Sequence, residues 1–69
     1  MLYNEENAKL LNGEKIKLLT KANRVVSGVL KYTEGDYLEI IHESGTTSMV
    51  NKWNIIRLCK ECDYPIEQL

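Results

Sequence analysis

The stretch RVVSGVLKY, residues 24–32, decides the fold that this sequence predicts. Its apolar residues fall on both alternating faces, and Gly28 lies in its middle. A glycine in the interior of a strand usually marks a bulge, a sharp bend or a close approach of another backbone. We therefore expect a strand that bends at Gly28 and contributes to two faces of a curved sheet.

Four further strand-like runs accompany this stretch, separated by turn sequences. In EKIKLLTK, residues 14–21, apolar Ile16 and Leu18 alternate with lysines, which is the two-residue period of a half-buried strand. The segments KAN, TEGD and SG between the runs are rich in residue types that favour tight turns. The predicted strands are residues 14–21, 24–32, 37–43, 46–51 and 54–59, followed by a charged tail, 60–69, that we expect to fray.

One short helix is predicted at residues 4–12, before the strands. Asn4 can cap its start, and Glu5 and Glu6 occupy the first turn, where the helix dipole favours acids. Gly13 follows where a left-handed residue commonly ends a helix. We expect one mainly-β domain, residues 1–69, with five strands in a strongly bent antiparallel small barrel. Strands this short and few must close into a barrel or leave edges that pair with another copy.

Length and charge limit the functional classes. A chain of 69 residues buries only roughly 60% of its unfolded surface, so we expect oligomerisation to add stability. The net charge of −1 indicates no bulk affinity for nucleic acid, although lysines concentrate in the first half and acids in the second. The lysines could form a basic face that attracts a nucleic-acid backbone, or they could only solubilise exposed strands.

No feature predicts secretion, a membrane span, a metal site or catalysis. There is no signal-peptide pattern, and no apolar run approaches the roughly 20 residues of a membrane span, so we expect a cytoplasmic protein without a membrane partner. Cys59 and Cys62 have the spacing of a zinc-ligand pair, but a structural zinc site needs four ligands and His42 is the only histidine. We expect free thiols and no cofactor, and rank a zinc-binding regulator last. No nucleophile is placed with a histidine and an acid, so we expect no enzyme.

The stretch SMVNKWNII, residues 48–56, gathers the main candidate binding residues. Asn51, Lys52, Trp53 and Asn54 place two amides, a cation and an indole side by side. An indole stacks on bases, a lysine pairs with phosphate, and amides reach base edges. The alternative is that Trp53 packs in a subunit interface and Asn54 only shapes a turn.

The order of elements and two segments resemble the Sm/LSm superfamily, in particular its Hfq-like bacterial and phage members. SGVLKYTEGDYLEII, residues 27–41, is similar to the first Sm motif, and SMVNKWNIIRL, residues 48–58, is similar to the second. Trp53 replaces the histidine of the Hfq-like motif, and Asn51 replaces its tyrosine. The positions that match the two motifs are Gly28, Leu30, Asp36, Leu38 and Lys52.

The resemblance implies a homo-oligomeric ring of five to seven subunits, in which the fourth strand of one subunit pairs with the fifth strand of the next. It also implies non-catalytic binding of single-stranded RNA at a pore, as a chaperone or scaffold. Asp36 and Tyr37 would line that pore, although strands also use tyrosine for packing alone. The alternative function is a small-barrel protein-interaction or assembly module without nucleic acid. The candidate RNA-binding residues are Lys52, Trp53, Asn54, Asn51, Tyr37 and Asp36.

Overall fold

The computed structural model describes residues 2–60, and these form one short helix and five strands. The predicted mainly-β composition is confirmed, with shorter elements than expected at most ends. The junction predicted between the last two strands is a single 3-10 turn, which includes Asn54, a residue predicted to begin the last strand. The elements are α1 (Glu5–Leu10), β1 (Lys15–Thr20), β2 (Val25–Lys31), β3 (Tyr37–Ile41), β4 (Thr47–Asn51), η1 (Lys52–Asn54) and β5 (Ile55–Lys60). The predicted tail lies outside the described residues apart from Lys60.

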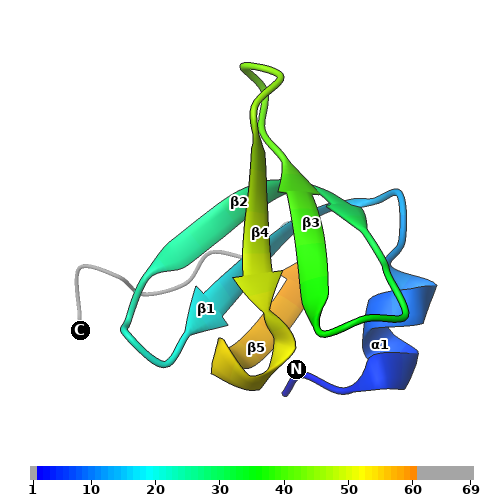
Figure 1. Cartoon of the computed structure of the whole chain (residues 1–69), viewed down its shortest axis with the longest axis vertical. Coiled ribbons are helices and arrows are strands. Elements are labelled where there is room, and N and C mark those ends of the chain that lie inside the picture. The colour runs from blue at the N-terminus through cyan, green and yellow to red at the C-terminus, as the bar shows by residue number, and fades with distance from the viewer. Residues whose placement is uncertain (1, 61–69) are drawn as a thin grey trace.

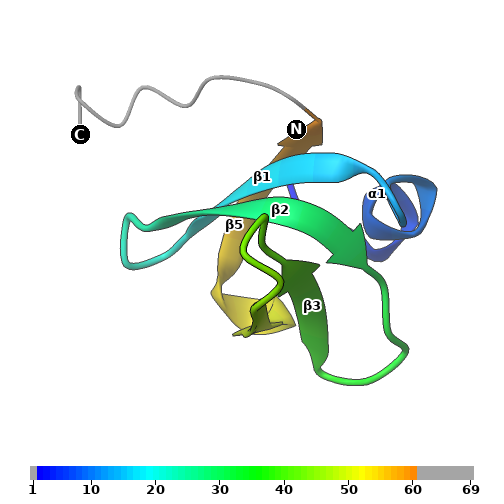
Figure 2. The ribbon, with the colours of Figure 1, turned by 90° about the horizontal axis from the view of Figure 1, so that it is seen from above.

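The five strands form one antiparallel sheet in the order β4-β3-β2-β1-β5 (Figure 1). The sheet is strongly bent, as the view from above shows (Figure 2), but it does not close, because β4 and β5 remain its two edges. On the β5 side, Leu2 forms an isolated bridge to Arg57, and the Tyr3 N–H donates to the Ile56 carbonyl oxygen at 3.0 Å. The described chain is therefore an open curved sheet, since five short strands turn only part of the way around the core.

Gly28 lies where β2 changes partner. The first part of β2, Val25 to Val29, pairs with β1, and the last part, Val29 to Lys31, pairs with β3. Gly28 has a φ of +155°, and a Cβ atom placed on it would lie 2.5 Å from the carbonyl oxygen of Ile41. The expected close approach of another backbone at this glycine is confirmed.

The concave side of the sheet holds the core. Eight apolar side chains are buried there. Burial of each leucine or isoleucine among them contributes roughly 1.5–3 kcal/mol to the free energy of unfolding. Every strand except β4 supplies at least one of them, while β4 adds the partly buried Val50. The buried set is Ala8, Ile16, Leu18, Leu30, Leu38, Ile40, Ile55 and Leu58.

Helix α1 covers one end of this core through Ala8, which is fully buried. The Asn4 side chain accepts from the N–H of Asn7 at 2.8 Å, so the predicted cap is confirmed. The helix ends at Leu10 rather than at residue 12, and the Gly13 N–H then donates to the Leu30 carbonyl oxygen at 2.7 Å. This bond ties the helix exit to the end of β2. No helix among residues 2–60 is long and apolar enough to cross a membrane.

We expect Gly28→Ala to lower the free energy of unfolding by about 1–3 kcal/mol, the usual cost of overpacking, because the new methyl group meets backbone atoms of Ile41. Gly35→Ala is the matched control, since a Cβ there meets nothing within 4 Å, and its effect should stay within about 0.5 kcal/mol. Urea denaturation followed by circular dichroism measures both. Equal stability of the two variants would show that the bend does not depend on Gly28.

Candidate functional site

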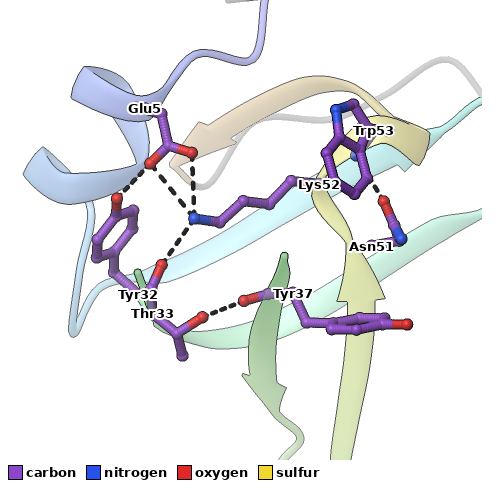
Figure 3. A network of polar contacts seen from close by, with 7 residues as sticks. All are labelled: Glu5, Tyr32, Thr33, Tyr37, Asn51, Lys52 and Trp53. Atoms are coloured by element: carbon purple, nitrogen blue, oxygen red, sulfur yellow. Dashed lines mark hydrogen bonds and ion pairs between the residues drawn. The ribbon is translucent and has the colours of Figure 1, made fainter. Parts of the chain in front are cut away.

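The predicted cluster Asn51 to Asn54 comprises the last residue of β4 and the turn η1, which connects β4 to β5. The Asn51 side-chain oxygen accepts from the N–H of Trp53 at 2.8 Å, which caps the turn (Figure 3). The N–H of Lys52 donates to the Asp36 carbonyl oxygen at 2.8 Å, and the N–H of Lys21 donates to the Asn54 carbonyl oxygen at 2.8 Å. The turn is thus held from the start of β3 on one side and from the β1–β2 turn on the other.

The Lys52 side chain is directed toward α1 and is only 9% exposed. Its ammonium group donates to both carboxylate oxygens of Glu5, at 3.1 and 3.3 Å, and to the Thr33 carbonyl oxygen at 2.7 Å. It also lies 4.6 Å from the centre of the Tyr32 ring. The three N–H bonds of the ammonium therefore have three acceptors within the chain. We call this group of Glu5, Tyr32, Thr33 and Lys52 the clasp.

Glu5 is the acidic member of the clasp, and half of its side chain is exposed. The Tyr32 hydroxyl donates to the Glu5 carboxylate, and this bond, followed by the bond from Lys52, holds the pKa of Glu5 below its ordinary value of 4.5. The same carboxylate raises the pKa of Tyr32 to about 12. The sequence indicated Glu5 only as a helix-dipole partner, because Lys52 lies 47 positions further along the chain and no local pattern signals the contact.

Trp53 and Tyr37 are both accessible but do not face each other within one chain. The indole is 65% exposed and the phenol is 44% exposed. Figure 3 shows the two rings well apart, with the Trp53 ring in η1 and the Tyr37 ring beside β4. Tyr37 is paired with Asn51 in the sheet register, and its carbonyl oxygen accepts from the Thr33 hydroxyl. A base sandwiched between these two rings would need one of them from another subunit.

A groove of about 890 Å³ lies beside η1, on the side away from the clasp, between β4 and the first half of β2. The β1–β2 turn contributes Lys21 and Arg24 to its wall, and η1 with the end of β4 contributes Asn51 and Asn54. None of the described residues that line it is acidic. The sequence singled out the amides, but only the bend of the sheet brings the two cations to them.

His42 connects the two walls of this groove. Its Nδ1 lies 2.9 Å from the Ser27 carbonyl oxygen and its Nε2 lies 2.6 Å from the Ser48 hydroxyl oxygen. A carbonyl oxygen only accepts, so Nδ1 carries a hydrogen and donates it to Ser27. His42 therefore links β2 to β4 where the two strands separate, a contact that its position after a strand did not reveal.

Residues 2–60 include no group of three or more histidine, cysteine, aspartate or glutamate side chains that could hold a metal ion. Cys59 is disulfide-bonded, so the expectation of a free thiol at this position is wrong. Cys62 lies outside the described residues. The spacing of two cysteines near the end of a chain does not by itself distinguish a thiol pair from a disulfide.

No protein-family model matches this chain, and no curated protein or solved structure is significantly similar to it. The resemblance to the Sm/LSm superfamily therefore stays a prediction that rests on the two quoted segments.

We expect Tyr32→Phe to raise the pKa of Glu5 toward 4.5, because the Tyr32 hydroxyl makes the largest contribution to lowering it. A carboxyl whose pKa is lower in the folded than in the unfolded state stabilises the fold. This contribution is complete at pH values above the unfolded-state pKa and is lost as the pH falls through the folded-state pKa. The variant should therefore lose less stability than the native chain on acidification below pH 4.5. An NMR titration of the Glu5 carboxyl carbon measures the shift. Tyr37→Phe is the control, and an equal response in both variants would contradict the assignment.

Proposed function

We propose that this chain forms a closed ring and binds single-stranded RNA without catalysis, as a chaperone or scaffold. The observation that carries the proposal is the groove beside η1, which is lined by two cations, Lys21 and Arg24, and two amides, Asn51 and Asn54, and by no acid among the described residues. The exposed indole of Trp53 belongs to the same turn. Cations, amides and an exposed aromatic ring are the three groups that single-strand binding combines.

The charge of the groove supports a polyanionic ligand. Ten of the 69 residues are acidic and the net charge is −1, so a groove wall without an acid differs from the average surface. Lys21 and Arg24 would displace counterions from the phosphate backbone, and this release makes such binding sensitive to salt. The amides of Asn51 and Asn54 would hydrogen-bond to base edges or ribose hydroxyls.

Trp53 supplies the stacking surface in this proposal. Its backbone is held by the Asn51 cap, so the ring is presented from an ordered turn, and stacking on one base contributes roughly 1–3 kcal/mol. Lys52 keeps η1 in place through its buried side chain and its bond to Asp36. Tyr37, which is exposed beside the same turn, would extend the surface.

The free edge of β4 supports the ring. The bonds from His42 N–H to Thr46 O and from Lys52 N–H to Asp36 O fix the hydrogen-bonded pairs of the β3–β4 ladder. In an antiparallel ladder, hydrogen-bonded pairs alternate with pairs that are not hydrogen-bonded to each other. Thr47, Met49 and Asn51 belong to pairs of the second kind, so their N–H groups point away from β3. An edge of this kind pairs with another strand unless it is protected. Repetition of a weak RNA site around a ring would raise the avidity for one strand.

A second candidate, a protein-interaction module, is favoured by one other surface. Val29, Ile41, Tyr37 and Met49 lie on the convex face of β2, β3 and β4 and are all exposed, Met49 to 65%. Lys31 and Glu39 share this face, and exposed apolar patches rimmed by polar residues mark protein interaction sites. Binding through this face would change little with salt, whereas phosphate binding weakens steeply.

We expect the double variant Lys21→Ala/Arg24→Ala to bind U-rich or A-rich oligonucleotides more weakly than the native chain. The slope of the log affinity against log salt should fall by about 0.7 for each lost phosphate contact on a single strand. Fluorescence of Trp53, the only tryptophan, reports binding at low and high salt. The single variants Lys21→Ala and Arg24→Ala are measured beside the double variant, and Lys31→Ala, on the convex face, is the charge-matched control for each of the two.

If the control lost as much oligonucleotide affinity as the groove variants, the overall charge of the chain and not the groove would account for the binding. A native ring whose Trp53 fluorescence does not respond to any oligonucleotide would contradict RNA binding. The convex-face candidate would then be preferred.

We expect Met49→Pro to prevent assembly while the single chain stays folded. Proline removes the outward N–H of β4, which the β3–β4 ladder does not use, and so blocks pairing along this edge. Light scattering should give the mass of a ring for the native chain and of a monomer for the variant. Met49→Thr, which changes the side chain but keeps the N–H, should still assemble. A monomeric native chain would refute the ring.

A further inference from the structure

We infer that Glu5 is a specificity-determining residue, which neutralises Lys52 and so excludes phosphate from the α1 side of η1. This inference rests on the proposed function, since it states which side of the turn takes the RNA backbone. α1 and the β1–β2 turn lie on opposite sides of η1 and β4 in both views (Figures 1 and 2). The same turn therefore has a cationic groove on one side and the clasp on the other.

Within the clasp, the Lys52 ammonium has no N–H bond left to donate to a further acceptor. Its N–H bonds go to the two Glu5 oxygens and to the Thr33 carbonyl oxygen, and only 9% of the side chain is exposed. A phosphate that approached Lys52 would have to displace the carboxylate. The charge of a lysine at this position is thus used inside the chain.

Glu5 is the charge that an approaching ligand meets first. Its side chain is 52% exposed, whereas Lys52 lies beneath it. The Tyr32 hydroxyl donates to the same carboxylate and so holds it in place. Glu5 is ionised at neutral pH, as any carboxyl with a pKa of 4.5 or lower is. A fixed, partly exposed carboxylate repels phosphate, while the groove offers Lys21 and Arg24 without a lining acid.

Lys9 is the other cation close to the clasp, and it lies 5.8 Å from the centre of the Tyr32 ring. Glu5 thus has cations on two sides, both of which contribute to lowering its pKa. Removal of the carboxylate charge would leave two cations beside the Tyr32 ring, Lys9 at 5.8 Å and Lys52 at 4.6 Å from its centre, without the acid that neutralises them. That pair would form a new anion site, and Glu5 prevents its formation.

The test compares Glu5→Gln with Glu6→Gln. Both substitutions remove one negative charge from the first turn of α1, but only Glu5 contacts Lys52. Glutamine keeps the length and one acceptor oxygen of glutamate, so α1 remains docked, and the amide NMR spectrum verifies this. Inorganic pyrophosphate is titrated while the Cε–Hε signals of Lys52 are recorded. A saturable shift is expected only in Glu5→Gln.

RNA binding gives the second readout. In Glu5→Gln the log–log salt slope for an oligonucleotide should steepen by about 0.7, the value of one added phosphate contact. Glu5→Gln/Lys52→Met should lose this gain, because the added contact requires the ammonium. An equal gain in Glu6→Gln, or a pyrophosphate shift of Lys52 in the native chain, would overturn the inference.

The two proposals fail in different ways. If no variant binds oligonucleotides, but pyrophosphate shifts Lys52 in Glu5→Gln alone, the RNA function is refuted and the exclusion of anions by Glu5 stands. If the native chain binds RNA and Glu5→Gln changes neither readout, the groove remains the RNA site and the role of Glu5 is refuted.

Discussion

The close approach between Gly28 and the backbone of Ile41 is the constraint on which the rest of the structure depends. It allows β2 to pair with β1 along its first part and with β3 along its last part. The change of partner turns β3 and β4 over the core and separates β4 from the first half of β2. The groove beside η1 occupies this separation, and His42 spans it. A side chain at position 28 would occupy the space of a carbonyl oxygen, so the bend and the groove share one cause.

The turn η1 connects this bend to the distribution of charge. Its backbone is bonded to the start of β3 and to the β1–β2 turn, and its lysine reaches α1. Cations on its two sides therefore have different surroundings: Lys52 is buried against a carboxylate, whereas Lys21 and Arg24 line a groove without acids. This difference gives a chain of net charge −1 one surface suited to a polyanion. It also explains how the lysine of the conspicuous segment 51–54 can serve the fold while Lys21 and Arg24 line the groove.

Much of the fold could be predicted from local patterns. The Asn4 cap, the alternation in β1 and the interior Gly28 each act over a few residues, and the structure confirms them. Closure into a barrel could not be predicted, because it depends on whether the outer edges of β4 and β5 meet, and in the described chain they do not. The candidate turn 51–54 was recognised as a unit, but the contact between Glu5 and Lys52 was not, since it joins residues that are far apart in sequence.

The sequence by itself determined which segments form strands, where the central strand bends, and which short segment gathers amides, a cation and an indole. These features follow from backbone preferences and from the two-residue period of side chains along a strand, which are properties of neighbouring residues. Only the tertiary structure decided what each charge faces. Lys52 is paired and buried because α1 docks beside η1, and Lys21 and Arg24 line a groove because the sheet bends. The surroundings of a charge depend on groups brought close in space, which the order of residues along the chain does not specify.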